Sequence, residues 1–375
     1  MKLRLMKMKC DRSALLEAVN GVSRAVSAKS SMPALEGIKF KCGYDGVVLT
    51  AFDLEIGIIT ELDADVEEPG EIVITARLLG DMLRKIDGDS VEITSSPDLK
   101  VTVRSGITVF NFIGIPASDF PELPIPDTDN TLAIKSCALR DMINKTLYAV
   151  STTDQKPVHT GTKFIIENDE LTMVSVDGYR LAIARSTGAS LLETKSFIVP
   201  GKTLGEISKL MGDSDEEITV GTARRSAVFR LGQYTVVSRL LEGDFLDYRK
   251  AIPPECKMRV KIAVKDFADA IERVSLIIND RFKSPVRLIF SNNRLTMTCK
   301  TALGSSYDEI ECTTEGEGEM EIGFNNRYLL DALRYSGLAE VVLEIASPTS
   351  PMKMVPVEGN DFLFLVLPVR IKNEQ

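Results

Sequence analysis

The sequence contains a single histidine, His159, and no tryptophan among its 375 residues. One histidine excludes a histidine-rich zinc site and leaves little scope for a histidine-based proton relay. The six cysteines include no Cys-x-x-Cys pair, which favours free thiols in a reducing, cytoplasmic compartment over a disulfide framework. No apolar run approaches the roughly 18 residues of a membrane-spanning helix. The first nine residues alternate basic with apolar side chains, which indicates a strand and not the core of a signal peptide.

Catalytic and nucleotide-binding motifs are also missing. Gly201-Lys202-Thr203 resembles the end of a phosphate-binding loop, but Ser196 stands where that loop requires its first glycine. The glycines between Glu315 and Glu319 alternate with carboxylates, which would repel the phosphates of a dinucleotide. No nucleophile elbow, metalloprotease motif or cluster of metal ligands occurs. These absences predict a binding protein that is not an enzyme and needs no cofactor or metal.

What the sequence does contain is a threefold repeat. Leu79, Leu204 and Leu329 are spaced by one third of the chain, and each is followed two positions later by an acidic residue. Apolar, β-branched segments recur at almost the same interval and are typical of strands. These segments are Val47–Asp53, Leu171–Asp177 and Leu295–Thr301. A period this long exceeds the roughly 20–50 residues of solenoid repeats, so it indicates three copies of a domain.

Each copy is expected to run helix, strand, strand, helix, strand, strand, which makes the fold class α+β. Proline-rich segments at Pro116–Pro126 and Gly243–Pro254 cannot continue a helix or a central strand and therefore act as linkers. The predicted domains are residues 1–127, 128–254 and 255–375. The helices are expected at 11–26, 77–87, 138–150, 202–212, 264–278 and 327–336, from apolar residues at helical spacing.

The charge is unevenly distributed. The chain carries a net charge of −9, yet the expected helices together are slightly basic, so the remainder is more acidic than the whole. Basic helices on an acidic protein suit a molecule whose helices face a polyanion such as nucleic acid. Helices with mixed, solvated faces explain the same distribution, so charge alone leaves both interpretations open.

Two strand-like segments have unusual features. Ile107–Phe112 carries large apolar side chains on both faces, so it is either buried on both sides or an edge strand that pairs with another chain. Phe362–Ile371 is interrupted by Pro368, which would weaken a central strand. The second segment is therefore predicted to lie at a sheet edge or beside a groove.

Several segments resemble the bacterial sliding clamps, the β subunits of DNA polymerase III, and in order and spacing they cover nearly the whole chain. They are Met32–Leu35, Thr50–Glu55, Ala117–Pro121, Val176–Ile183, Phe245–Arg249, Met320–Asn325 and Leu367–Ile371. The resemblance implies three clamp domains per chain and a head-to-tail homodimer that closes a ring of six domains, with helices around a hole and sheets outside. It implies a processivity factor that encircles double-stranded DNA without reading its sequence. The implied partners are the replicative polymerase, an ATP-driven clamp loader and other replication and repair proteins.

The resemblance also implies three sets of site residues. The implied DNA-binding residues are Lys29, Arg77, Lys202, Arg281 and Lys283. The implied dimer interface brings Phe110 and Phe112 against Leu276 and Ile277 of the partner subunit. The implied peptide-binding groove consists of His159, Gly178, Tyr179, Arg180, Leu181, Leu246, Lys250, Tyr328, Leu367, Pro368, Val369, Arg370 and Ile371. Other roles for these residues stay open. The basic residues could be solvated surface cations, the apolar residues could pack in the core, and Arg180 could form a structural ion pair.

The sequence departs from the family pattern at three places. Its first five residues precede the usual start, so translation from Met6 is an alternative. His159 stands where the family usually has an apolar groove residue, and Lys250 stands where arginine is common, which puts bidentate contacts there in doubt. An enzyme or ligand-binding oligomer that reuses the triplicated scaffold is the alternative function.

Overall fold

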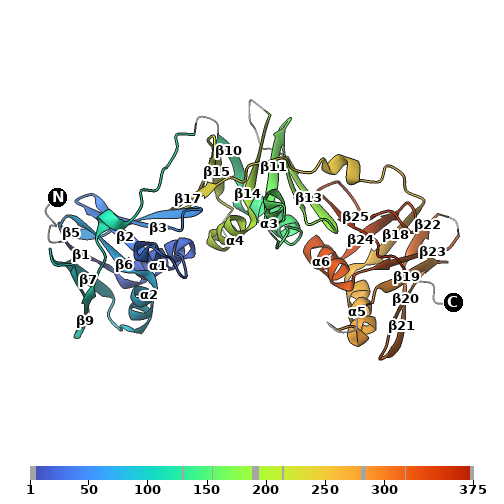
Figure 1. Ribbon diagram of the computed structural model, residues 1–375, viewed down its shortest axis with the longest axis horizontal. Coiled ribbons are helices and arrows are strands. Elements are labelled where there is room, and N and C mark those ends of the chain that lie inside the picture. Colours follow the sequence, from blue (N-terminus) through green and yellow to red (C-terminus); the bar gives the residue numbers. More distant parts are fainter. Residues whose placement is uncertain are drawn as a thin grey trace. The chain divides into compact units, whose positions relative to one another are not determined.

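The computed structural model describes residues 6–128, 131–153, 155–187, 194–212, 215–279, 284–316 and 318–371 (Figure 1). The chain divides into two compact units. One unit comprises Met1–Cys137 with Gly205–Leu240, and the other comprises Ala138–Leu204 with Leu241–Gln375. The division runs through the central repeat, so each unit holds one terminal repeat and part of the central one.

The first repeat consists of two helices packed against each other and covered by sheets. Helix α1 (Arg12–Val22) begins at Asp11, whose Oδ1 accepts a hydrogen bond from the Ala14 N–H at 2.9 Å. Helix α2 spans Ala76–Lys85 and buries Leu79 completely. The strands are β1 (Met6–Asp11), β2 (Gly37–Gly43), β3 (Gly46–Phe52), β4 (Ile56–Leu62), β5 (Asp65–Glu68), β6 (Gly70–Thr75), β7 (Ser90–Ser95), β8 (Lys100–Ser105) and β9 (Thr108–Ile113).

The second and third repeats follow the same order. The second has α3 (Ser136–Leu147), α4 (Gly201–Leu210) and strands β10 (Thr131–Lys135), β11 (Gly161–Glu167), β12 (Glu170–Val176), β13 (Arg180–Thr187), β14 (Lys195–Pro200), β15 (Glu217–Thr222), β16 (Ser226–Leu231) and β17 (Tyr234–Arg239). The third has α5 (Val264–Val274), α6 (Asn326–Ser336) and strands β18 (Met258–Ala263), β19 (Val286–Ser291), β20 (Arg294–Thr301), β21 (Gly304–Glu311), β22 (Thr313–Glu315), β23 (Met320–Phe324), β24 (Glu340–Ile345), β25 (Met352–Pro356) and β26 (Phe362–Val366). Leu204 and Leu329 are fully buried, as Leu79 is. The predicted threefold repeat is therefore present in the fold.

Antiparallel sheets continue from one repeat into the next. β17 of the second repeat pairs with β4 of the first, with Val236 opposite Ile58, in a sheet ordered β10-β15-β16-β17-β4-β3-β2-β6. β26 of the third repeat pairs with β13 of the second, with Phe364 opposite Ala182, in a sheet ordered β14-β11-β12-β13-β26-β25-β24-β18-β22. The remaining sheets are β5-β1-β7-β8-β9 and β21-β20-β19-β23.

Two strands are left at sheet edges by this arrangement. Within the described residues, β9 pairs only with β8, and β21 pairs only with β20. β9 occupies the place in the first repeat that β17 and β26 occupy in the others. β21 likewise corresponds to β4 and β13. Of the two alternatives for Ile107–Phe112, the structure therefore selects an edge strand.

Two sequence-based expectations need correction. Each repeat has more strands than the expected pattern, because short strands such as β6 lead directly into a helix and show no separate period. Of the two positions predicted for Phe362–Ile371, the sheet edge is wrong, because β26 pairs with β13 on one side and with β25 on the other. A position beside a groove stays a prediction. The strand ends at Val366, so Pro368 lies beyond the ladder and removes no hydrogen bond from it.

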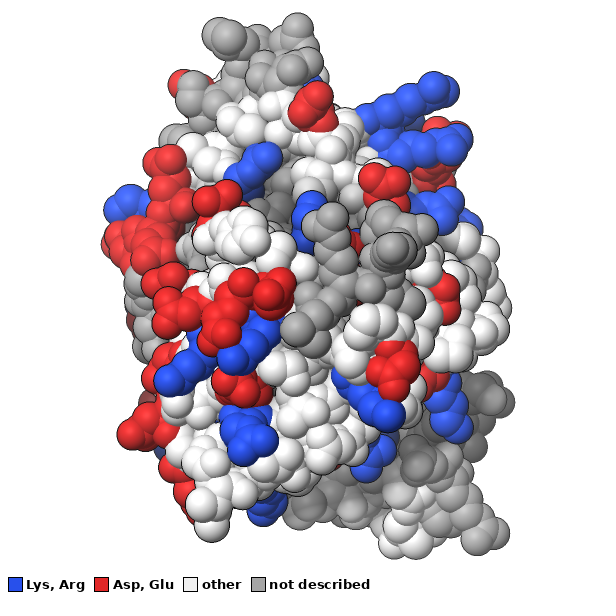
Figure 2. Space-filling model, turned by 90° about the vertical axis from the view of Figure 1, so that its left-hand side faces the viewer, with Lys and Arg blue, Asp and Glu red and all other residues white. Residues whose placement is uncertain are grey.

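Figure 2 shows the side of the molecule on which β1, β7 and β9 are drawn in Figure 1. Acidic side chains gather along one edge of this face, and uncharged surface fills much of its lower part. Among the described residues, no helix is long and apolar enough to span a membrane. None of the six cysteines, all of which lie among the described residues, forms a disulfide. Burial raises the pKa of Cys10 and of Cys42 to about 12, so both remain thiols at neutral pH.

Candidate functional site

A tight turn between β12 and β13 forms the centre of the predicted groove region. The Asp177 carboxylate accepts hydrogen bonds from the N–H groups of Tyr179 (2.9 Å) and Arg180 (3.0 Å). Gly178 has φ +93°, a left-handed conformation that glycine adopts without steric cost. The turn therefore holds the Tyr179 side chain outward, where it is 63% exposed.

The chain that follows β26 lies beside this turn. The Leu367 N–H donates to the Tyr179 carbonyl at 2.9 Å, and the Val369 N–H donates to the Gly323 carbonyl at 2.8 Å. A Cβ at Gly323 would lie 2.8 Å from Cγ1 of Ile371, so the absence of a side chain there makes room for the tail. Leu367 and Val369 are both exposed. Two backbone hydrogen bonds thus fix an apolar segment whose side chains face solvent.

The linker between the second and third repeats contributes a third set of side chains. Tyr248 is buried in one apolar cluster with Leu181, and Phe245 packs against that cluster. Leu246, next to Phe245, is exposed. Lys250 is also exposed, and its Nζ lies 3.0 Å from Asp247. We call the turn 177–180, the linker 245–250 and the tail 367–371 the tail–turn surface.

The tail–turn surface contains most of the residues predicted for the groove. Tyr328 of α6 joins it, because its ring stacks on that of Tyr179 with centroids 6.0 Å apart. His159 contacts it through Phe245, with ring centroids 5.5 Å apart in an edge-on arrangement. Burial, together with the nearby charge of Lys156, lowers the pKa of His159. An uncharged imidazole at neutral pH is compatible with a position that the family usually fills with an apolar side chain.

Arg180 does not extend toward solvent. Its Nε lies 2.9 Å from Asp177 Oδ2, its Nη1 donates to Asp331 of α6, and the side chain is only 13% exposed. The guanidinium carbon lies 5.2 Å from the ring centre of Tyr148 and 4.8 Å from that of Tyr328. Burial by itself lowers the pKa of Arg180, and the two carboxylates outweigh it and raise the pKa. These contacts fit the structural ion pair that the sequence left open.

Removing the Arg180 side chain should destabilise the protein. Arg180→Ala leaves two half-buried carboxylates without their cation, and we expect a loss of about 2–4 kcal/mol in the free energy of unfolding. Arg249→Ala is the matched control, because Arg249 also contacts a carboxylate (Glu167, 3.6 Å) and a tyrosine ring, but is largely exposed. An exposed pair contributes about 0–1 kcal/mol. Urea unfolding of both variants measures the difference; equal losses would contradict the buried role of Arg180.

Several residues at this junction were not predicted from the sequence. Tyr148 stacks on Tyr335 of α6, with ring centroids 5.0 Å apart, and contacts Phe364 edge-on at 5.5 Å. Asp331 was recognised only as a repeated acidic position. The repeat did single out the position of Tyr148. It is the second residue of Leu147–Val150, and the second residues of the equivalent segments Ser23–Val26 and Ser275–Ile278 are Arg24 and Leu276.

Three of the predicted DNA-binding residues lie on or near helices in the described part of the chain. Arg77 of α2 lines a cavity of about 460 Å³ together with Arg84 and the segment Val26–Ala28, which leads into exposed Lys29. Lys202 is an exposed residue of the first turn of α4. Arg281 and Lys283 lie outside the described residues.

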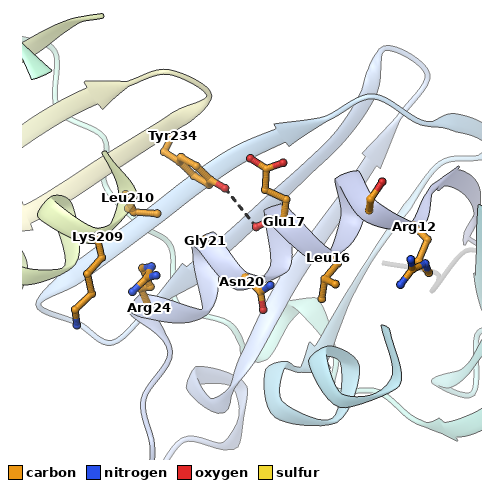
Figure 3. A pocket seen from close by; sticks show the side chains of 10 residues that line it. Arg12, Leu16, Glu17, Asn20, Gly21, Arg24, Lys209, Leu210 and Tyr234 are labelled. Carbon is orange, nitrogen blue, oxygen red and sulfur yellow. Dashed lines mark hydrogen bonds between the residues drawn. The ribbon is translucent and has the colours of Figure 1, made fainter. Parts of the chain in front are cut away.

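A second cavity, of about 420 Å³, lies between α1 and the end of α4 (Figure 3). Arg24 and Lys209 lie close together at one end of it, and Arg12 lies at the other. Its floor includes Tyr234, whose hydroxyl donates to the Glu17 carbonyl at 3.3 Å. None of these cations was singled out from the sequence. In the described part of the chain, no group of three or more acidic, histidine or cysteine residues could hold a metal ion.

The predicted interface residues lie on the edge strand β9 and on a short helix beside the edge strand β21. Phe110 and Phe112 are half-buried on β9, and their neighbours Val109 and Ile113 are exposed. Leu276, 84% exposed, and half-buried Ile277 lie on a short 3₁₀ helix, Ser275–Ile277, that directly follows α5. Each pair belongs to a different compact unit of the chain.

Comparison with known proteins gives concordant matches. Profiles of the DNA polymerase III beta subunit match residues 6–124 (N-terminal domain), 133–247 (central domain) and 249–370 (C-terminal domain). The beta sliding clamp of Staphylococcus epidermidis is 29% identical over 375 residues, 98% of this chain and 100% of that protein. The sliding clamp of Bacillus subtilis has a TM-score of 0.94 at 29% identity, covering 98% of this chain and 100% of that one. The clamp of Pseudomonas aeruginosa bound to griselimycin has a TM-score of 0.92 at 26% identity, with the same coverage.

Proposed function

The chain belongs to the family of DNA polymerase III beta subunits, the bacterial sliding clamps, and on that premise we propose which of its surfaces bind protein, DNA and a second subunit. It is a DNA polymerase processivity factor and not an enzyme. Two copies form a ring that encircles duplex DNA, slides along it and tethers the replicative polymerase. Enclosure makes tight, sequence-specific contacts unnecessary.

Partner proteins dock on the tail–turn surface through a short linear peptide. The exposed apolar side chains of Tyr179, Leu367 and Val369 support this assignment, because the hydrogen bond from Leu367 to the Tyr179 carbonyl holds the tail beside the turn. Leu246 adds an exposed apolar side chain from the linker. A peptide with an apolar anchor would bury them, which is a recurring recognition mode. The Pseudomonas aeruginosa relative was solved with griselimycin bound, which suits a ligand-accepting surface in this family. His159, Gly178, Leu181, Lys250, Tyr328, Pro368, Arg370 and Ile371 complete the proposed groove, and Arg180 positions the turn.

The subunit interface follows from the repeat. β17 pairs with β4 and β26 pairs with β13, so β9 is expected to pair with β21 of the partner subunit. In the hairpin β8–β9, Ser105 lies opposite Thr108, and in the hairpin β16–β17, Leu231 lies opposite Tyr234. Phe110 and Val236 each lie two positions after the second residue of their pair, so they correspond to each other. Phe364 is the corresponding residue of β26. Ile58 lies opposite Val236, and Ala182 lies opposite Phe364. Each of these two residues lies two positions after the last residue of the turn that leads into its strand. Ser306 holds that position after the turn Thr301–Gly304, so Phe110 is expected opposite Ser306 of the partner subunit.

The residues after the first helix of each repeat support the same interface. Arg24 contacts Glu206 of the second repeat, and Tyr148 contacts Tyr335 and Phe364 of the third. Leu276 is the corresponding residue of the third repeat, and it is 84% exposed. Since Phe364 corresponds to Phe110, Leu276 and Ile277 are expected to contact Phe110 and Phe112 of the partner subunit.

The two helices of each repeat face the DNA. Lys29, Arg77 and Lys202, together with Arg281 and Lys283, contact phosphates weakly and without reading bases. A separate, ATP-driven clamp loader opens the ring, because this sequence carries no nucleotide-binding motif. We place the domain boundaries near residues 127 and 254 and assign the protein to the cytoplasm, as free thiols suggest.

The observation that carries ring closure is that β9 and β21 each have a strand on one side only within the described part of the chain. Loading the protein onto nicked circular DNA with its clamp loader, followed by a single cut of the circle, tests it. We expect retention on the intact circle and release within the time needed to slide off the linear product. Retention after linearisation would mean that direct contacts hold the DNA and would contradict enclosure.

A further inference from the structure

A carboxylate lies between two cations on the helices assigned to the DNA side. Glu206 of α4 is 2.8 Å from Lys209 Nζ through Oε1 and 3.2 Å from Arg24 Nη1 through Oε2. Its side chain is only 19% exposed, so water screens these pairs less than at an open surface. Arg24 and Lys209 line the cavity of Figure 3, and Glu206 contacts both of them.

We propose that Glu206 competes with DNA phosphates for Arg24 and Lys209 and thereby limits how strongly the ring grips the duplex. The proposal rests on the assignment of the helices to the DNA side. Carboxylate and phosphate oxygens accept hydrogen bonds from the same donors. Both carboxylate oxygens of Glu206 contact a cation, Oε1 that of Lys209 and Oε2 that of Arg24. A DNA phosphate can therefore bind either cation only by displacing its contact with Glu206. A clamp that holds by enclosure must slide, and weak phosphate contacts keep the barrier to sliding low.

The same position carries an acid in every repeat, but only Glu206 is placed for this role. Asp81 pairs with Arg84 of its own helix at 2.8 Å. Asp331 contacts Arg180, which is buried between two tyrosines and cannot reach DNA. Among the ion pairs of the described residues, Glu206 alone of the three contacts two cations. Those cations come from two repeats and line a solvent-accessible cavity.

The test compares Glu206→Gln with the charge-preserving Glu206→Asp and with Glu68→Gln, which removes an exposed carboxylate from β5. Affinity for a short linear duplex is measured against salt, together with one-dimensional diffusion of the loaded clamp on a long DNA. Freeing two cations should steepen the plot of log K against log salt by about 1 to 2 and tighten binding about 10-fold at 50 mM salt. Diffusion of the loaded Glu206→Gln ring should slow, and both control variants should behave like the original protein.

An unchanged salt slope and diffusion rate for Glu206→Gln would overturn the proposal. Adding Arg24→Ala and Lys209→Ala to Glu206→Gln should abolish the gain, and a gain that persists would assign it to other groups. Thermal unfolding checks that each variant is folded. A failure of the proposed function itself would give another result. The original protein would then not be retained on circular DNA, or would not be released when the circle is cut. Failure of this inference alone leaves that behaviour intact.

Discussion

Truncation after Val366 should abolish binding of a clamp-binding peptide and leave the dimer intact. The deletion removes the exposed Leu367 and Val369, which line the tail–turn surface. It also removes the hydrogen bonds to the carbonyls of Tyr179 and Gly323 that hold the tail in place. Loss of an apolar anchor site costs about 2–4 kcal/mol, so we expect Kd to rise by about 30- to 1,000-fold.

A second truncation, after Ile371, is the matched control for this experiment. It deletes the residues that follow the tail and retains every side chain assigned to the tail–turn surface, so peptide affinity should be unchanged. Fluorescence anisotropy with a labelled peptide from a polymerase measures affinity, and analytical ultracentrifugation measures the dimer. The edges β9 and β21 contain no residue of the tail, so dimerisation should survive both truncations. Unchanged peptide affinity after removal of 367–375 would place the peptide site elsewhere.

The repeat itself could be predicted from sequence because its signals are local. Leu79, Leu204 and Leu329 lie on amphipathic helices, and each packs into a core with no exposure. Linker positions followed equally from proline, whose ring cannot continue a helix or a central ladder. Strand number was underestimated, since short strands that run directly into helices, such as β6 into α2, show no separate period.

The chemistry of the site was less predictable than the fold. The resemblance named Arg180 for the groove, but whether its guanidinium faces a ligand depends on Asp331 and Tyr148, which lie far away in sequence. The same reason explains why Glu206 and Arg24 were missed. Ion pairs between repeats depend on how consecutive domains pack, and no spacing within one domain encodes that geometry. Sheet continuity, on which we base the proposed pairing of β9 with β21 of the partner subunit, likewise became visible only in the pairing of β17 and β26.

Phe110→Asp should convert the dimer to monomers. A charge at the centre of β9 would be buried opposite Ser306 and beside Leu276 of the partner subunit, and burial of an unpaired carboxylate is costly. We expect the dimer dissociation constant to rise by at least about 100-fold, as for an interface hot spot. Tyr44→Asp, at an exposed aromatic residue in the turn between β2 and β3, is the matched control and should leave the dimer unchanged. A Phe110→Asp protein that stays dimeric at nanomolar concentration would contradict the β9–β21 interface.

The register of that interface can be tested with paired cysteines in a background that carries Ser at the exposed Cys137 and Cys256. Phe110→Cys with Ser306→Cys should form an intersubunit disulfide on oxidation, because residues directly opposite on antiparallel strands have Cα atoms about 4.5–5.5 Å apart, within disulfide range. Phe110→Cys with Tyr307→Cys should not, because a shift of one residue points the second side chain to the other face of the sheet. Covalent dimer on a non-reducing gel measures both. Efficient closure of the shifted pair would refute the register, and a correctly cross-linked ring, once closed around a DNA circle, should resist denaturant while the circle is intact.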